Sequence, residues 1–361
     1  MTEFRKYIPL FLGGEGGGGD TTDYLCIENT SGTTNTITVK RLKGTTLAIA
    51  TTVEYSKDKE TWTTLTLPTA NNGTKDVVQL NAGEKVWLRN DSGIWSKFQS
   101  GSSYDYLSFL ASASCKAYGN PKSLIDYTDI DNVDLANGCF YGLFKGNTNL
   151  TDASRLVLDS MTLVTRCYCQ MFSGCSSLVD LPVLPATTLA YGCYYYMFYQ
   201  CTSLTETPVL PATVMKPECY YYMFYGCSSL VTAPALPATS LASKCYYSMF
   251  YSCANLANAP ALPATTLAEY CYYGMFMNCS SLVTAPVLPA SVLQLKSYQR
   301  LFKNCTSLTS ITTYADDISA ADSTSDWVGG IVSTGTFHNL GTATYQSGNN
   351  GIPTTWTEVH T

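Results

Sequence analysis

Cysteine is the most regularly spaced reactive residue in this chain, whereas histidine, present in only two copies, offers little for acid–base or metal chemistry. Two positions of a repeating unit are cysteine, eight residues apart, which is about 12 Å along a helix and too far for a disulfide. Zinc is disfavoured because neither C-x-x-C pairs nor histidines accompany them. We predict buried thiols acting as small hydrophobic groups, with disulfides between neighbouring repeats as the alternative. The two columns are Cys167, Cys193, Cys219, Cys245 and Cys271, and Cys175, Cys201, Cys227, Cys253, Cys279 and Cys305.

Tyrosine, with 27 copies, also recurs in columns and supplies the candidate binding residues. Neighbouring positions on a helix point about 100° apart, so the columns cannot all face a core, and at least one should lie at the surface. Stacked rings with hydroxyl tips suit recognition of a protein or a glycan. The alternative is that the rings only pack coil against coil. The first column is Tyr168, Tyr194, Tyr220, Tyr246, Tyr272 and Tyr298. The candidate binding face is the second, Tyr195, Tyr221, Tyr247 and Tyr273, with the third, Tyr199, Tyr225 and Tyr251.

The carboxylates do not form a catalytic or metal-binding pattern. Asp126, Asp129, Asp131 and Asp134 resemble part of a calcium loop but lack its glycine and terminal glutamate, so a solvated linker is expected. Glycoside hydrolysis needs two carboxylates across a cleft, and the repeats carry only scattered acids. We therefore predict no enzymatic activity, no metal and no cofactor. The remaining acids are Asp180, Glu206, Glu218 and Glu269 in the repeats, and Asp316, Asp317, Asp322 and Asp326 after them.

These residues must be positioned by a repeat of 26 residues, CYYxMFxxCxSLxxxPxLPATxLxxx. Cys271, Tyr272, Met275, Phe276 and Cys279 follow a helical period, which predicts a short helix in each coil. The segment after it holds two prolines and should be extended. One coil cannot bury its own apolar side, so neighbours must stack into a solenoid. Residues 139–310 are expected to form seven such coils.

The flanking regions complete a predicted α+β fold. Residues 21–115 alternate in period two between turn signals, which is typical of a small all-β sandwich-like domain. Residues 116–138 are interpreted as a linker. Residues 311–361 leave the repeat and are expected to cap its last coil.

Residues 1–20 are interpreted as a docking peptide on a glycine-rich tether, with a disordered tail as the alternative. The apolar run is shorter than a secretory signal requires, so we expect the protein to fold in a reducing cytoplasm. No later stretch approaches the roughly 20 apolar residues of a membrane span. A net charge of −6 disfavours a nucleic-acid partner. The docking residues would be Phe4, Tyr7, Ile8, Leu10, Phe11 and Leu12.

The repeat resembles the BspA-like leucine-rich repeats of surface proteins from Bacteroidota, which share an F-x-x-C-x-x-L core. Phe224, Cys227 and Leu230 form that core in one coil. Five further coils repeat it in phase, beginning at Phe172, Phe198, Phe250, Phe276 and Phe302.

The resemblance implies adhesion, because such surface proteins bind host matrix proteins or other cells. Similar proteins of bacteriophages that infect Bacteroidota are fibres and other appendages, and these need no export signal. We therefore expect a virion structural or appendage protein, made in the host cytoplasm, with a bacterial cell-surface adhesin as the alternative. Its expected partners are other virion proteins through the N-terminal peptide, and a host-surface protein or glycan through the solenoid. A homo-oligomer is compatible with the sequence.

Overall fold

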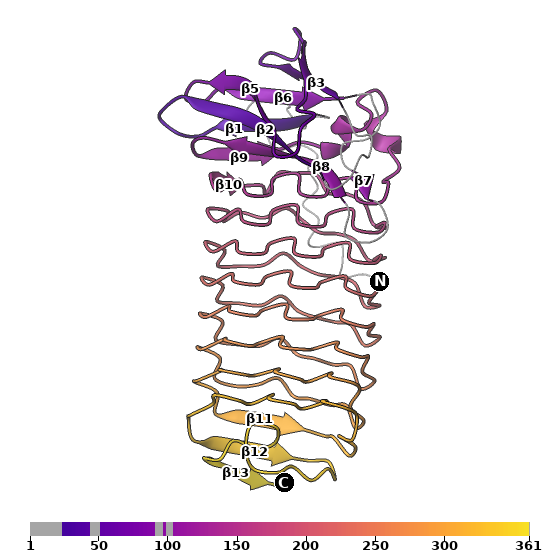
Figure 1. Cartoon of the computed structure of the whole chain (residues 1–361), viewed down its shortest axis with the longest axis vertical. Coiled ribbons are helices and arrows are strands. Elements are labelled where there is room, and N and C mark those ends of the chain that lie inside the picture. Colours follow the sequence, from indigo (N-terminus) through magenta and orange to yellow (C-terminus); the bar gives the residue numbers. More distant parts are fainter. Residues whose placement is uncertain (1–23, 44–50, 91–96, 99–103, 361) are drawn as a thin grey trace, which may run out of the picture.

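The protein is an elongated stack with a β-sheet region at one end and its C-terminal strands at the other (Figure 1). A computed structural model describes residues 24–43, 51–90, 97–98 and 104–360. The expected docking residues of the N-terminal peptide lie outside this range. Within it, the only helical elements are two short 3-10 turns, η2 (Pro121–Leu124) and η3 (Ile130–Asn132).

The N-terminal region consists of two sheets that share one hydrophobic core. The first has the order β10-β9-β1-β6-β3-β4 and the second the order β5-β2-β8-β7. Alternation along β1 places Leu25 and Ile27 in the shared core, whereas Cys26 lies in a small cluster on the other side of the sheet. The strands are β1 (Leu25–Asn29), β2 (Asn35–Lys43), β3 (Thr52–Ser56), β4 (Thr63–Thr66), β5 (Thr74–Leu80), β6 (Lys85–Arg89), β7 (Lys97–Phe98), β8 (Tyr104–Ala111), β9 (Cys115–Tyr118) and β10 (Leu150–Asp152).

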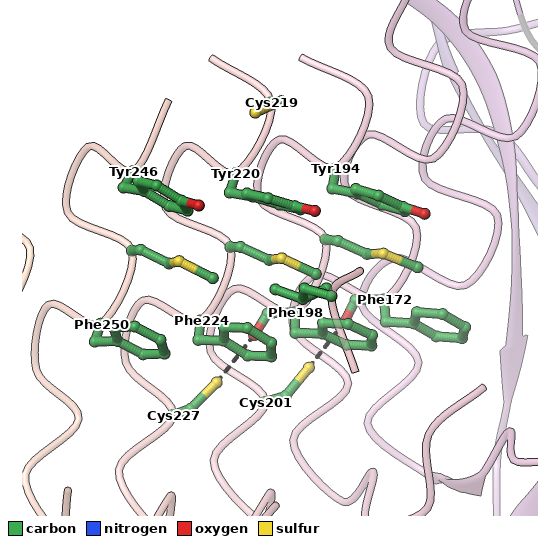
Figure 2. Packing of buried hydrophobic residues seen from close by; sticks show 14 of the residues in the cluster. Phe172, Tyr194, Phe198, Cys201, Cys219, Tyr220, Phe224, Cys227, Tyr246 and Phe250 are labelled. Carbon is green, nitrogen blue, oxygen red and sulfur yellow. Dashed lines mark hydrogen bonds between the residues drawn. The ribbon is translucent and has the colours of Figure 1, made fainter. Parts of the chain in front are cut away.

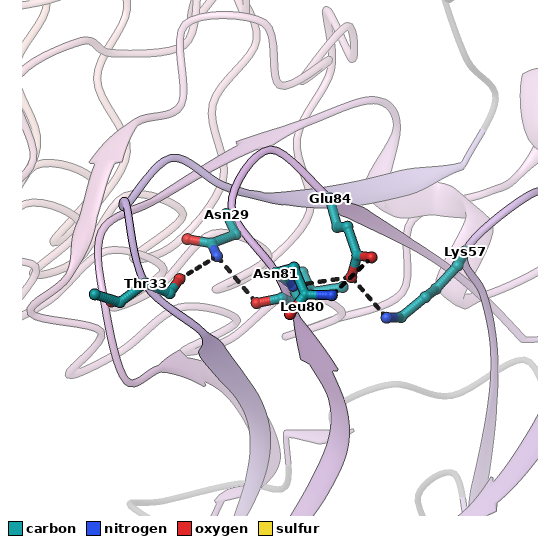
Figure 3. Close-up of polar contacts among 6 residues, drawn as sticks. All are labelled: Asn29, Thr33, Lys57, Leu80, Asn81 and Glu84. Atoms are coloured by element: carbon teal, nitrogen blue, oxygen red, sulfur yellow. Dashed lines mark hydrogen bonds and ion pairs between the residues drawn. The ribbon is translucent and has the colours of Figure 1, made fainter.

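Polar contacts at the strand ends connect the two sheets. The Asn29 side chain donates to the Thr33 carbonyl at 2.8 Å and to the Leu80 carbonyl, in the other sheet, at 3.0 Å (Figure 3). Nearby, Glu84 accepts from Lys57 at 2.7 Å and from the Asn81 N–H at 2.9 Å. These contacts, with the Lys57 ammonium first, lower the pKa of Glu84 to about 2. The Asn29 and Glu84 side chains thus bond backbone groups at or next to the strand ends.

The N-terminal region also closes the first end of the solenoid. Strand β10 belongs to the first coil and pairs in parallel with β9. The N–H groups of Phe109 and Cys115 donate to the carbonyls of Leu143 and Asn149 at 2.8 and 3.0 Å. These strands occupy the place of a preceding coil, so the first coil is not left with an open edge.

The segment interpreted as a linker contributes to the core. In η2, Ser123 and Leu124 are fully buried. The Ser123 hydroxyl donates to the Leu88 carbonyl at 3.1 Å and accepts from the Leu25 N–H at 2.9 Å. Residues 121–125 are thus packed under β1 and β6.

The prediction of a short helix in each coil is wrong. A helix needs N–H bonds to the carbonyl four residues back, but here every second N–H bonds three residues back and the others bond the next coil. In the third coil, the Tyr195 N–H donates to Gly192 O at 3.1 Å. The Tyr194 N–H instead donates to Cys219 O, in the next coil, at 3.0 Å. We call this face of the solenoid the turn wall; it comprises residues 166–175, 192–201, 218–227, 244–253, 270–279 and 296–305.

The turn wall repeats every four residues. Gly192, Tyr196 and Gln200 have positive φ angles of 56°, 57° and 56°, and equivalent residues in the other coils do the same. Each four-residue turn directs two side chains inward and two outward. A period of four differs from the helical 3.6 by less than one residue over two turns, which explains why the apolar pattern resembled a helix.

The inward side chains form ladders along the solenoid axis (Figure 2). Phe198 stacks on Phe224 with ring centroids 5.5 Å apart and planes 9° from parallel. Tyr194 and Tyr220 stack in the same way at 5.7 Å. We number coils 1 to 7 by the buried Phe144, Phe172, Phe198, Phe224, Phe250, Phe276 and Phe302.

The opposite side of each coil is extended, as the prolines predicted, and neighbouring coils meet there at isolated parallel bridges such as Thr232↔Asn258 and Thr284↔Ser310. Few of these residues form regular strands. Long runs of this side carry no charged residue, for example residues 228–243.

The C-terminal end continues the coil before closing it. Asp322, Asp326 and Gly330 repeat the positive φ angles of the turn wall, so the four-residue turns continue past residue 310. Trp327 stacks between Tyr298 and Tyr345 at 6.3 and 5.7 Å and donates from Nε1 to the Gly351 carbonyl at 2.7 Å. A parallel sheet of β11 (Ser310–Thr313), β12 (Gly335–Asn339) and β13 (Trp356–Val359) completes the end.

Candidate binding face on the turn wall

The structure separates the tyrosine columns by depth. The first column is buried: Tyr194, Tyr220 and Tyr246 expose 2%, 1% and 1% of their surface. Both columns of the candidate binding face are half-buried on the outer side of the turn wall. Two of every four residues in this wall face outward, which places the second and third columns there.

The outer rings stack on each other along the axis. Tyr195, Tyr221, Tyr247 and Tyr273 follow one another with centroid distances of 4.7, 4.6 and 4.4 Å and planes within 14° of parallel. Because the ring faces cover each other, a ligand can reach mainly the ring edges and hydroxyl groups. In the third column, Tyr199, Tyr225 and Tyr251 stack at 4.8 and 4.6 Å.

Two further tyrosines join this face and were not predicted. The ring centroid of Tyr196 lies 4.5 Å from that of Tyr195 and 5.0 Å from that of Tyr199, so Tyr196 stands between the second and third columns. Tyr222 occupies the same place one coil later, 5.2 Å from Tyr225. Both have positive φ angles. The signal in the sequence was the triple-tyrosine run at 194–196 and 220–222, which a helical interpretation could not place.

A charged cluster borders the face next to Tyr195, the first ring of the second column. The Arg166 guanidinium lies 4.6 Å from the Tyr195 ring centroid, in cation–π geometry. It donates to Glu218 at 3.2 Å and to the Tyr191 hydroxyl at 3.1 Å. These contacts cross three coils and hold the first ring of the second column in place.

Charges of both signs border the other end. Arg300 donates to the Tyr273 hydroxyl at 3.0 Å, and Lys303 lies 2.5 Å from Asp326. Between the two ends the outward side chains of coils 3 to 5 are mainly tyrosine. The middle of the face is therefore mainly uncharged, with Glu218 and Lys244 as the charged turn-wall residues of coils 4 and 5.

The environment favours the protonated form of three tyrosines of the second column. Burial, with smaller contributions from neighbouring rings, raises the pKa of Tyr195, Tyr221 and Tyr247 above the usual value of 10. Their hydroxyls are neutral donors and acceptors at physiological pH, without phenolate character.

The cysteines are buried free thiols, as predicted. All fifteen lie within the described residues, and none forms a disulfide. In the column beginning at Cys175, each thiol donates to a phenylalanine carbonyl of the preceding coil: Cys201 to Phe172 and Cys227 to Phe198, both at 3.1 Å (Figure 2). The thiols thus give these carbonyls a second hydrogen bond, beside that from a backbone N–H, in addition to filling space.

The acidic groups are local structural contacts. Asp126 accepts from the Thr128 N–H and hydroxyl at 2.8 and 2.6 Å. Asp316 accepts from Thr342. Across the described ranges no three side chains of His, Cys, Asp or Glu are grouped so that they could hold a metal ion. No described helix is long and apolar enough to cross a membrane.

Comparison with known proteins agrees with the coil geometry. Six copies of the BspA type leucine rich repeat region match at residues 138–230, 157–275 and 192–322, together more than half of the chain. Comparisons with curated proteins and with solved structures gave no match. The resemblance noted from the F-x-x-C-x-x-L core is confirmed: this chain belongs to the BspA-type leucine-rich repeat family.

Proposed function

We propose that this chain is a non-enzymatic binding protein that contacts its ligand through the outer tyrosine columns of the turn wall. The observation that carries the proposal is the half-buried stack of Tyr195, Tyr221, Tyr247 and Tyr273. BspA-type repeat proteins are commonly adhesive, which agrees with it.

The packing of these rings suits recognition. Tyr221 and Tyr247 are held by the rings before and after them, so little side-chain entropy remains to be lost on binding. Each ring is still partly exposed on the outer side of the turn wall. Tyrosine in such a setting provides contact area and hydrogen bonds together. A host-surface protein or glycan is the proposed class of ligand.

The test is to remove outward hydroxyls without disturbing the stack. We expect Tyr221→Phe combined with Tyr225→Phe and Tyr247→Phe to reduce retention on a panel of immobilised host-surface proteins and glycans at least tenfold. Tyr220→Phe is the matched control, because its buried hydroxyl has no hydrogen-bond partner and cannot contact a ligand. Unchanged retention of the triple variant, with the wild-type fold, would reject the proposed face.

We further propose that the protein is an appendage of a phage virion and attaches to the particle through its N-terminal peptide. The resemblance to phage-encoded repeat proteins supports this, as does the elongated shape of the stack (Figure 1). The alternative, a bacterial surface adhesin, is favoured by the repeat family itself. Mass spectrometry of purified particles and of surface-labelled cells separates them, because the protein should be found in only one of the two fractions.

A further inference from the structure

A shallow hollow of about 490 Å³ runs beside the third tyrosine column. Its lining residues come from every coil between Thr148 in coil 1 and Ser252 in coil 5. Four coil steps of about 4.8 Å give a length of roughly 19 Å along the solenoid axis. The hollow is open and elongated, a shape that suits an extended chain better than a compact small molecule.

The lining is uncharged and rich in hydroxyl groups. Ser176, Thr202 and Ser228 occupy one position in successive coils, and Gln200 and Tyr225 border them. No lining residue carries a charge at physiological pH, because burial raises the pKa of Tyr225, the one titratable group, above its usual value of 10. A charged ligand would find no counter-charge here and would lose hydration on entering.

The side chain at one position of each coil determines how far the hollow extends. One position of the coil holds Gly174, Gln200, Gly226 and Ser252 along the hollow, and Asn278 and Asn304 beyond it. The Gln200 side chain covers Gly226, whereas the space at Gly174 is open except for the Gly146 backbone. The Asn304 amide donates to Asn278 at 2.8 Å, and Asn278 donates to Ser252 at 3.3 Å. These asparagines fill the equivalent space in coils 6 and 7. The hollow is thus a feature of particular coils, not a groove common to the whole solenoid.

The backbone in the hollow cannot pair with a peptide strand. The N–H groups of Gly174, Gln200 and Gly226 already donate to carbonyls of the next coil at 2.7, 2.7 and 2.8 Å. Adding a peptide strand requires free backbone groups at an edge. The groups that a ligand can contact are side-chain hydroxyls, one amide and a tyrosine edge; of these, the Thr202 hydroxyl already donates to the Ser176 carbonyl at 3.3 Å and is left as an acceptor.

We propose that this hollow binds a neutral linear oligosaccharide lying along the solenoid axis. Sugar hydroxyls would exchange hydrogen bonds with the serine and threonine column, and the apolar edges of the sugar rings would contact Tyr225. An extended oligosaccharide advances by about one sugar for each coil, so the same contacts recur. This inference rests on the proposed binding function and specifies a ligand class and a place for it.

Titration calorimetry tests the proposal with the full chain. The probes are neutral oligosaccharides of glucose, mannose and xylose from one to six units, and oligogalacturonides of equal length as charged counterparts. We expect one neutral series to bind, with affinity rising over the first four or five units and then levelling. The charged series and the monosaccharides should bind at least tenfold more weakly.

Two variants locate the site. Gly174→Asn introduces into coil 2 the residue that occupies the same position in coil 6, Asn278. The added Cβ has room, because its nearest neighbour is Gly146 at 3.6 Å. Ser228→Asn fills the hollow from the hydroxyl column. Both should weaken oligosaccharide binding at least tenfold. Thr306→Asn, in the same column two coils beyond the hollow, is the control and should leave it unchanged.

The outcomes separate this inference from the proposed function. Binding that is equal in Gly174→Asn and wild type, or equal for charged and neutral probes, overturns the oligosaccharide site. If no oligosaccharide binds while an immobilised protein is retained through the tyrosine hydroxyls, the inference fails and the binding function stands. Absence of both activities rejects the two together.

Discussion

The N-terminal sheets and the solenoid are stabilised in different ways. In the sheets, Arg41 and Asp105 form an ion pair at 2.8 Å with both groups almost fully buried, and strands pair in antiparallel register. In the middle coils of the solenoid, identical neutral side chains stack on their own copies. Phe198, Phe224 and Phe250 are one such ladder.

The difference shows that a repeat can pack its coils without pairs of unlike, complementary side chains. A coil inside the stack meets the same residue above and below, so its contacts need size and shape in common but no complementary charge. Ion pairs instead involve residues that do not recur from coil to coil, as at Arg166–Glu218 and Lys303–Asp326. Four predictions test this contrast, from the largest expected effect to the smallest.

The largest expected effect is a loss of unfolding free energy of the solenoid at alkaline pH. Burial raises the pKa of Cys193 and Cys227 to about 12, whereas an unfolded thiol titrates near 8.5. The unfolded chain therefore releases protons first, and stability is full below about pH 8.5 and falls as the pH rises toward 12. Each such thiol should lower the free energy of unfolding by about 1.4 kcal/mol per pH unit.

Denaturant midpoints under reducing conditions between pH 7 and 10.5 measure this loss. A Cys227→Ser variant carries one thiol fewer and should show a shallower pH dependence. A midpoint that stays constant up to pH 10.5 would contradict the thiol ladder.

Breaking the buried ion pair should be the largest single-site effect in the sheets. Asp105→Asn leaves the Arg41 guanidinium buried without its counter-charge, and we expect a loss of about 3–5 kcal/mol in the free energy of unfolding. Glu54→Gln is the control, because its partner Arg89 is more exposed and the expected loss is below about 1 kcal/mol. Equal losses in urea denaturation would show that the Arg41 site relaxes or admits water.

The two thiol columns should differ in their tolerance of serine. The Cys227 thiol donates to the Phe198 carbonyl, so a hydroxyl finds an acceptor in place. The Cys245 thiol makes no such bond to the preceding coil. Cys245→Ser should therefore cost about 1 kcal/mol more than Cys227→Ser, because it buries an unsatisfied hydroxyl. Thermal unfolding of the two variants gives the difference, and the reverse order would refute the role of the carbonyl.

Glycine should have opposite effects in the two regions. Lys244 has a φ of 58°, so Lys244→Gly should stabilise the protein by roughly 0.5–1 kcal/mol. Lys85 lies in strand β6, where Lys85→Gly should destabilise it by a similar amount. The pair is matched, since each ammonium lies over a tyrosine ring, at 5.7 and 5.6 Å. Chemical denaturation showing the same sign for both would mean that the turn wall carries no backbone strain.

Much of the candidate site was predictable, because columns in a repeat can be read from spacing alone. The tyrosine columns through Tyr195 and Tyr199 were found in this way. Tyr196 and Tyr222 were missed because a helical period directs them elsewhere. The hollow was also missed, since it depends on which side chains are absent at Gly174 and Gly226 and on how neighbouring coils meet.

The sequence by itself determined the 26-residue period, the stacking of coils, the buried thiols and the need to close both ends. Each of these follows from which residue types recur and how far apart they lie. Only the tertiary structure decided that the turn wall is a chain of four-residue turns and that its second and third tyrosine columns face outward. The physical reason is that every second N–H, such as that of Tyr194, finds its acceptor in the next coil. No pattern within a single coil contains that partner, so local periodicity favoured a helix that the stacked chain does not form.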